Sequence, residues 1–282
     1  MYAAQASGLF AEQGLQVALS EPSGSGTRTV HDVAEGRAAF GLTSLFYFLQ
    51  AQRERHDLPA RFVAVVLNRS PLAAFVREDS DIEVPAQLAG RRVAVAGRFR
   101  WVADEYDGAL RLANVGRPIR VPTDEAGSDL LGRGEVDVVT SWADIAPVIR
   151  RRAATAVRRI DVGPDVYTVG LVASDAVDDH LARRLTVAFG ASLRLQRREP
   201  QLGIDAFHRA YPHLDAVDVA EAWTLLEPFV FDPHRPAGSM DAARWDETLD
   251  HVAFVHGIRT RPAAVYRTAL LERADVTAAT RS

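Results

Sequence analysis

The chain has no cysteine and no lysine, and each absence removes a class of chemistry. Without cysteine the protein forms no disulfide, no Cys-ligated zinc or iron–sulfur site and no thiolate nucleophile. Without lysine it forms no Schiff base and has no Walker-type phosphate loop. All 33 basic side chains are arginines, and the formal net charge of −4 argues against nucleic acid as a partner.

Long apolar stretches are also missing. No run approaches the roughly 18 residues needed to span a bilayer. Residues 1–10 lack the basic start and the sustained apolar core of a secretory signal peptide. As written, the sequence predicts a cytoplasmic protein, provided that Met1 is the true start.

What is present is the composition of an ordinary globular protein, with 48% hydrophobic and 25% charged residues. At about 150 residues per domain, the length predicts two lobes. Short β-type runs alternate with helical segments, which is typical of an α/β fold with parallel sheets. We expect helices between the strands and a largely helical segment from Ser174 onward. The expected strands are 15–19, 38–42, 62–67, 72–76, 92–96, 120–122, 136–140 and 167–173.

A weak internal repeat supports two similar lobes. Residues 35–44 and residues 133–141 each contain a helix end, a glycine, a buried strand and a Thr-Ser pair before a new helix. The two copies lie about one lobe length apart. The repeat therefore predicts a duplicated lobe architecture.

Polar turns between strands and helices form the candidate binding site. In open α/β sheets such turns bind ligands, because free backbone N–H groups and the helix dipole favour an anion or a polar oxygen. If two lobes face each other, four such turns converge on one cleft, although each Ser or Thr is equally explained as a helix cap. The four turns are residues 23–27, Thr43-Ser44, residues 97–101 and Thr140-Ser141-Trp142.

The larger side chains in these turns can each have a structural role or a ligand-binding role. Arg98 or Arg100 can hold a carboxylate or sulfonate in bidentate fashion, but arginine is common throughout this chain. Trp101 and Trp142 follow strand ends, where each is either a core residue or the wall of an apolar cleft.

No catalytic or metal-binding constellation stands out. None of the eight histidines lies in a nucleophile-elbow context, and we expect them on the surface or in loops. His251 and His256 lack the i, i+4 spacing that places two metal ligands on one helical face. The nearest acid–base candidates are His31, Asp104 and Asp144. We expect no cofactor and no metal.

The order of segments resembles the type II solute-binding proteins of ABC importers, in the branch that binds sulfonates, taurine, nitrate and thiamine-pyrimidine precursors. The similarity covers nearly the whole chain, although each piece is degenerate. The matching stretches are Gly8-Leu9-Phe10 with Gly14-Leu15, Glu35-Gly36 with Phe40-Gly41, Arg69-Ser70-Pro71, Leu88-Ala89-Gly90-Arg91-Arg92-Val93, Tyr167 with Gly170-Leu171-Val172-Ala173-Ser174, and Met240-Asp241 with Arg244-Trp245.

This resemblance implies a two-lobed, Venus-flytrap α/β fold that closes on a small molecule, with crossing strands near residues 70–76 and 167–173. Lobe I would comprise residues 1–70 and 176–282, and lobe II residues 71–175. Carried over by position, the ligand contacts would be Ser25, Thr27, Thr43, Ser44, Asn68, Arg69, Arg98, Arg100, Trp101, Trp142 and Tyr167.

The sequence departs from the family in two ways. Family members begin with a central strand of lobe I, whereas Met1 falls inside the helix that follows that strand. We therefore expect the true chain to start upstream, with that strand and an export signal, and the protein to lie outside the cytoplasm. Secondly, the enzymatic relatives (aromatic sulfinate desulfinases and pyrimidine synthases) use cysteine or lysine. This chain has neither, although residues 29–31 resemble a desulfinase active-site stretch.

The leading hypothesis is a monomeric solute-binding component of an ABC importer. It would close on a small organic ligand, anionic or heterocyclic, and deliver it to a membrane permease. The alternative is a pathway enzyme on the same scaffold, acting on an aromatic or heterocyclic substrate. A third reading is a degenerate cytoplasmic sensor.

Overall fold

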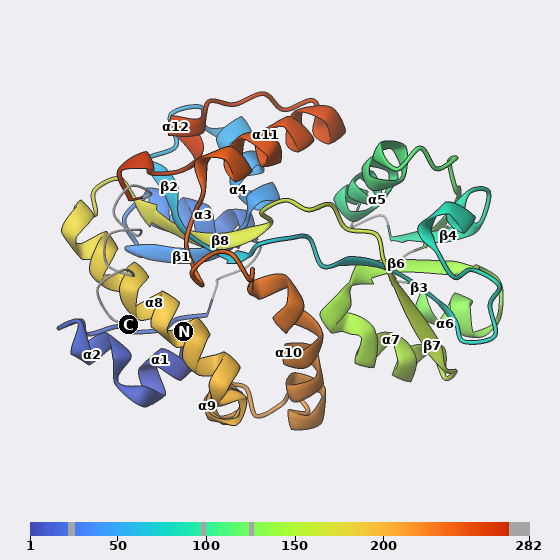
Figure 1. Cartoon of the computed structure of the whole chain (residues 1–282), viewed down its shortest axis with the longest axis horizontal. Coiled ribbons are helices and arrows are strands. Elements are labelled where there is room, and N and C mark those ends of the chain that lie inside the picture. The colour runs from blue at the N-terminus through green and yellow to red at the C-terminus, as the bar shows by residue number, and fades with distance from the viewer. Residues whose placement is uncertain (22–25, 97–99, 124–126, 271–282) are drawn as a thin grey trace.

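Two β-sheets, each at the centre of its own lobe, are joined by two crossing segments (Figure 1). The computed structural model describes residues 1–21, 26–96, 100–123 and 127–270. We call lobe I the part around the three-stranded sheet and lobe II the part around the five-stranded sheet. This is the two-lobed α/β architecture that the sequence predicts.

The sheet of lobe I has the strand order β1 (Phe40–Ser44), β8 (Val169–Ser174) and β2 (Ala60–Leu67). The central strand β8 runs antiparallel to both neighbours. All eight residues of β2 are buried or half-buried, because helices cover both faces of this sheet.

Two apolar clusters fill these faces. One contains Phe48, Phe62 and Trp245, and the other contains Leu171 and Phe189. The helices of lobe I are α1 (Tyr2–Ser7), α2 (Leu9–Glu12), α3 (Gly26–Ala34), α4 (Leu45–Glu54), α8 (Asp179–Arg198), α9 (Pro200–Ala210), α10 (Ala216–Val230), α11 (Ala242–His256), α12 (Pro262–Val265) and the short 3₁₀ helix η4 (Thr268–Leu270).

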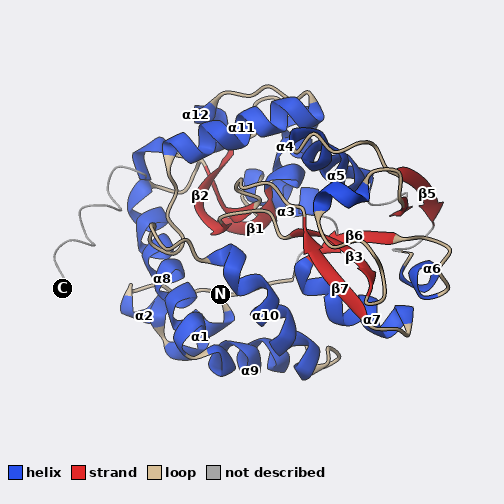
Figure 2. Cartoon of the chain, turned by 45° about the vertical axis from the view of Figure 1, so that its right-hand side comes forward, coloured by secondary structure: helices blue, strands red, loops and turns tan. Residues whose placement is uncertain are grey.

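The sheet of lobe II is mixed. Its strand order is β5 (Ile119–Thr123), β4 (Arg92–Ala96), β6 (Val138–Trp142), β3 (Leu72–Arg77) and β7 (Val157–Asp161). Strand β4 is parallel to β5 and β6, whereas β3 is antiparallel to β6 and β7. The helices around it are α5 (Arg100–Leu112), α6 (Ser128–Gly132), α7 (Ala146–Ala153) and the 3₁₀ helices η1 (Pro85–Leu88) and η3 (Ala143–Ile145). Figure 2 shows α6 and α7 on one side of this sheet and α5 on the other.

The internal repeat corresponds to two copies of the same turn. Gly36 and Gly134 both have a left-handed backbone, with φ of 75° and 73°. In each copy the two residues after the glycine donate backbone hydrogen bonds to one helical carbonyl, that of Asp32 in lobe I and of Leu130 in lobe II. Such a backbone favours glycine, because a Cβ is strained there.

Four details differ from the sequence-based expectation. Residues 15–19 form no strand, since no described strand lies beside them to complete the hydrogen bonds of a ladder. Among the described residues, parallel ladders between strands occur only in lobe II, whereas lobe I has a single parallel bridge, between Phe62 and Tyr266; strand β7 was not expected at all. Strand β8 falls within the range 71–175 assigned to lobe II, yet it pairs in the sheet of lobe I because the chain crosses back before Val169. The exact lobe boundaries stay a prediction.

The two crossing segments, residues 68–71 and 162–168, lie against each other. Ser70 N donates to the Pro164 carbonyl at 3.0 Å, and Gly163 N donates to the Leu72 carbonyl at 2.9 Å. A Cβ on Gly163 would lie 2.3 Å from the Ser70 carbonyl oxygen, so only glycine permits this approach. Among the described residues, no helix is both long and apolar enough to cross a membrane.

Candidate functional site

A cavity of about 460 Å³ lies between the two lobes, above the crossing segments. Lobe I contributes the turn from β1 to α4, the end of β2 and helices α10 and α11. Lobe II contributes α5 and the turn from β6 to η3. Most of the lining is apolar, which is typical of a site for a small organic molecule.

The wall from lobe I begins where β1 becomes α4. Ser44 is the N-cap of α4, and its Oγ accepts a hydrogen bond from Tyr47 N at 3.3 Å. Leu45 N donates to the Thr168 carbonyl at 2.8 Å, which ties this turn to the second crossing segment. The side chains that reach the cavity here are mainly apolar or aromatic, including Phe46.

The crossing segments supply hydroxyl groups at the base of the cavity. Ser70 Oγ accepts from Leu72 N at 3.3 Å. Thr168 Oγ1 is buried and has no hydrogen-bond partner among the described residues. A buried hydroxyl of this kind is available to a bound molecule, because leaving it unpaired is unfavourable.

The wall from lobe II carries Trp142, the last residue of β6, and Asp144, two residues after it. Ala143 N, between them, donates to the Pro71 carbonyl at 2.9 Å and ties this turn to the first crossing segment. Burial raises the pKa of Asp144, although a bond to its own backbone amide opposes the rise. The ionised carboxylate is therefore disfavoured by its surroundings.

A second carboxylate, Glu105 of α5, is paired across the lobes. His251 Nε2 donates to Glu105 Oε2 at 3.0 Å, and His256 Nε2 donates to Oε1 at 2.7 Å. Both histidines lie on α11 of lobe I. Burial alone would raise the pKa of Glu105, but the two histidine contacts outweigh it and lower this pKa to about 2.

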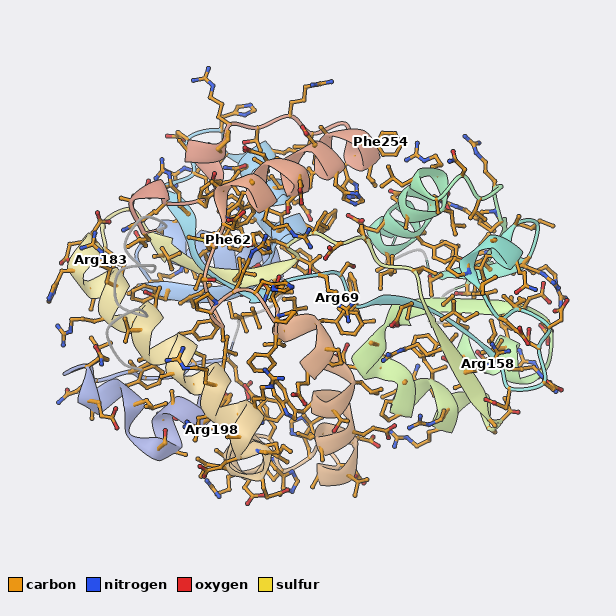
Figure 3. The ribbon with its side chains drawn as sticks, in the orientation of Figure 1. Phe62, Arg69, Arg158, Arg183, Arg198 and Phe254 are labelled. Atoms are coloured by element: carbon orange, nitrogen blue, oxygen red, sulfur yellow. The ribbon has the colours of Figure 1, made fainter. Side chains whose placement is uncertain are left out.

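The lobes touch along two seams beside the cavity. At the α5–α11 seam, the Arg111 guanidinium lies 5.1 Å from the centre of the Phe254 ring, which Figure 3 shows at the end of α11 nearest α5. A Cβ on Gly108 would lie 2.5 Å from Val255 Cγ2, so the two helices are in close contact. At the α7–α10 seam, Arg151 pairs with Asp218 at 2.7 Å.

The cavity brings together only part of the expected site. Ser44, Trp142 and Tyr167 line it, although the Tyr167 hydroxyl accepts from Asp241 N at 3.2 Å. Ser25 and Arg98, and the side chains of Arg100 and Trp101, lie outside the described residues.

The remaining expected contacts do not line this cavity. Thr27 is buried in α3, and Thr43 Oγ1 donates to the Gly26 carbonyl. Asn68 is buried and its amide Nδ2 donates to the Val230 carbonyl. Arg69 lies between the lobes (Figure 3), with Nε bonded to the Pro228 carbonyl at 3.2 Å and the guanidinium 4.8 Å from the centre of the Phe229 ring. Ligand contact at these positions stays a prediction.

The acid–base candidates are also separated. His31 pairs with Glu54 at 2.9 Å on the outside of lobe I. Asp104 lines a different cavity, of about 540 Å³, and lies within 3.5 Å of Arg120. Only Asp144 of the three reaches the interlobe cavity. Among the described residues, no group of three or more acidic or histidine side chains is arranged to hold a metal ion.

Sequence reasoning missed the pairing of Glu105 with two histidines. The expectation of surface or loop histidines was wrong for His251, which is 8% exposed inside α11. No local signal identifies this cluster, because Glu105 and His251 are 146 positions apart. They meet only after the two lobes are in contact.

Comparisons with known proteins agree with this architecture. The family model described as NMT1/THI5 like matches residues 1–190. No curated protein matches the sequence.

Solved structures with this fold include two sulfonate-binding proteins and one enzyme. The periplasmic aliphatic sulphonate-binding protein SsuA from Escherichia coli has a TM-score of 0.69 and 16% identity over 91% of this chain and 83% of that one. A periplasmic sulfonate-binding SsuA from Methylobacillus flagellatus has a TM-score of 0.68 and 12% identity over 100% and 90%. The desulfurization enzyme DszB has a TM-score of 0.61 and 16% identity over 98% and 95%. Identities this low indicate a shared fold only.

Proposed function

Because this chain belongs to the NMT1/THI5-like family, we propose that it is the solute-binding component of an ABC import system. The observation that carries the proposal is the interlobe cavity, which takes its walls from both lobes and its base from both crossing segments. A ligand held there contacts both lobes at once. It therefore stabilises the closed arrangement relative to an open one.

The crossing segments are suited to act as the hinge. They are the two backbone connections between the lobes, and each is hydrogen-bonded to a turn that lines the cavity. Movement at residues 68–71 and 162–168 changes the distance between these turns. Closure then presents a surface from both lobes to a permease, as in hinge-closing binding proteins.

The first ligand classes to test are organic anions and heterocycles with an apolar body. SsuA proteins are described as sulfonate-binding, and the cavity volume accommodates a molecule of modest size. The SsuA proteins are also described as periplasmic, so we place this protein outside the cytoplasm, as a monomer that meets a membrane permease. Permease and ATPase genes beside its own gene would support this role.

A ligand screen tests the proposal. Melting temperatures of the full chain are measured with sulfonates, taurine, nitrate, pyrimidines, aromatic acids and aromatic amines. A ligand of the cavity raises the melting temperature, because it stabilises the folded protein by RT ln(1 + L/Kd), where L is the free ligand concentration. The variant Leu226→Trp places a large ring into the cavity from α10 and should abolish the shift. Val217→Trp, on the same helix but 75% exposed, is the matched control. If no compound raises the melting temperature of the unaltered chain or of Val217→Trp, the binding proposal is wrong for these classes.

A pathway enzyme on the same scaffold is the second candidate. The fold is shared with DszB, and Asp144 is a partly buried carboxylic acid with a raised pKa inside the cavity. The lack of cysteine removes the thiolate used by desulfinases. Turnover of a bound aromatic or heterocyclic compound that is lost in Asp144→Asn would favour this candidate. Binding without turnover favours transport.

A further inference from the structure

The charges on the cavity wall do not match an organic anion. Among the described residues that line the cavity, the ionisable side chains are two carboxylates, two histidines and the phenols of Tyr47 and Tyr167, and none is an arginine. Arg69, which is part of the first crossing segment and of the expected site, is bound to the Pro228 carbonyl and stacked on Phe229. A sulfonate in this cavity would therefore face negative charge without a described guanidinium.

The two carboxylates differ in what neutralises them. Glu105 receives hydrogen bonds from His251 and His256. No side chain among the described residues donates a hydrogen bond to the Asp144 carboxylate, and no cationic side chain there pairs with it. An ionised carboxylate in an apolar wall is unfavourable unless a positive or hydrogen-bond-donating group lies against it.

Other groups that line the cavity with Asp144 fit such a partner. The aromatic ring of Trp142 lines the same cavity two residues before it, and aromatic faces attract cations. The buried Thr168 Oγ1 can accept a hydrogen bond from a donor nitrogen. The remaining wall, with Leu45 and Val66, suits an apolar body.

Resting on the proposed function, we propose that the ligand is an organic cation: an ammonium, amidinium or protonated nitrogen heterocycle attached to an apolar body. Its charged nitrogen lies against the Asp144 carboxylate and beside Trp142. Thr168 accepts a further hydrogen bond, and Glu105 remains paired with the histidines.

Titration calorimetry at pH 7 with three probes of one shape tests this assignment. The probes are 1-naphthylmethylamine, 1-naphthalenemethanol and 1-naphthalenemethanesulfonate. We expect the amine to bind at least tenfold more tightly than the alcohol, and the sulfonate to bind most weakly. In Asp144→Asn the amine should lose at least tenfold in affinity, while the alcohol is unchanged.

Two further variants keep the result interpretable. Asp104→Asn removes the same charge from α5 outside this cavity and should leave all three affinities unchanged. Thr168→Val removes the unpaired hydroxyl and should lower the affinity for the amine a few-fold. It gives a second measurement if Asp144→Asn does not fold. A sulfonate that binds more tightly than the amine overturns the cation assignment and leaves the binding function standing. If no probe binds, and if Leu226→Trp leaves the ligand-induced shifts of the melting temperature unchanged, the cation assignment and the binding function are both overturned.

Discussion

The two strand-to-helix turns that border the cavity share a backbone but differ in chemistry. Both follow a left-handed glycine and a strand of the repeat, β1 in lobe I and β6 in lobe II. Each is tied to a crossing segment by one backbone hydrogen bond, from Leu45 N in lobe I and from Ala143 N in lobe II. The repeat therefore reproduces the scaffold of the site in both lobes.

The side chains at matching positions have diverged. Ser44 caps α4 with its hydroxyl, whereas Trp142 occupies the matching N-cap position without any side-chain cap. Phe46 in lobe I is matched by Asp144 in lobe II, and both line the cavity. The lobe I turn thus stabilises its helix, while the lobe II turn places an aromatic ring and an acid where a ligand would lie.

The same contrast separates the two carboxylates of lobe II. Glu105 contributes to stability through its histidine partners, and its pKa is lowered. Asp144 has no such partner among the described residues, and burial raises its pKa. An ionisable residue whose surroundings disfavour its charged form does not stabilise the fold. Such residues are often found at functional sites. Four experiments can break or sharpen the comparisons of the two turns and of the two carboxylates.

The largest effect is expected for Glu105→Gln. The lowering of the Glu105 pKa from 4.5 to about 2 corresponds to roughly 3 kcal/mol of stability. Because the folded-state pKa is the lower one, this stability is present above pH 4.5 and is lost as the pH falls through about 2. Denaturant unfolding at pH 7 should show the loss, and the difference from wild type should shrink between pH 4.5 and 2.

Asp104→Asn is the control for Glu105→Gln. Asp104 lies one residue earlier on α5, has a half-exposed side chain and pairs with Arg120. Exposed ion pairs contribute about 0–1 kcal/mol, so this variant should change little. Equal losses in the two variants would contradict a special role for the interlobe pairing.

Gly36→Ala and Gly134→Ala test whether the two turns are equivalent. Nothing lies within 4 Å of a Cβ built on either glycine, so the whole effect comes from the left-handed backbone. Each substitution should cost about 1–2 kcal/mol, and the two costs should agree. Thermal unfolding of both variants gives the comparison. A large difference between the two stability losses would show that the two turns have the same backbone shape but contribute differently to stability.

Ser44→Ala should cost about 1 kcal/mol, because it removes the N-cap of α4. Trp142→Ala changes the residue at the matching position but removes no side-chain cap. Its main effect should be on ligand affinity, since it deletes part of the cavity wall. Calorimetric unfolding and binding titrations separate the two effects. A strong loss of affinity in Ser44→Ala with little loss of stability would reverse the roles assigned here.

Local pattern predicted much of this scaffold and little of its chemistry. The strand at 92–96 and the N-cap of α4 by Thr43 or Ser44 follow from hydrophobic runs and from capping preferences, which depend on neighbouring residues alone. Residues 15–19 have the composition of a strand, but a strand also needs a partner. Asp144 was only a general acid–base candidate, because its lack of a partner depends on how the lobes meet.

The smallest change in stability is expected for Asp144→Asn, and its sign is opposite to that of Glu105→Gln. Burial raises the folded-state pKa of Asp144 above its unfolded value of 3.8, so the folded protein loses stability as the pH rises from 3.8 through the raised value. Replacing the carboxyl by an amide removes that loss. The melting temperature should therefore be higher than that of wild type at pH 7 and equal to it below pH 3.8. A residue that destabilises the free protein is explained if it contacts a ligand. A lower melting temperature at pH 7 would instead give Asp144 a structural role, like that of Ser44 in the matching turn.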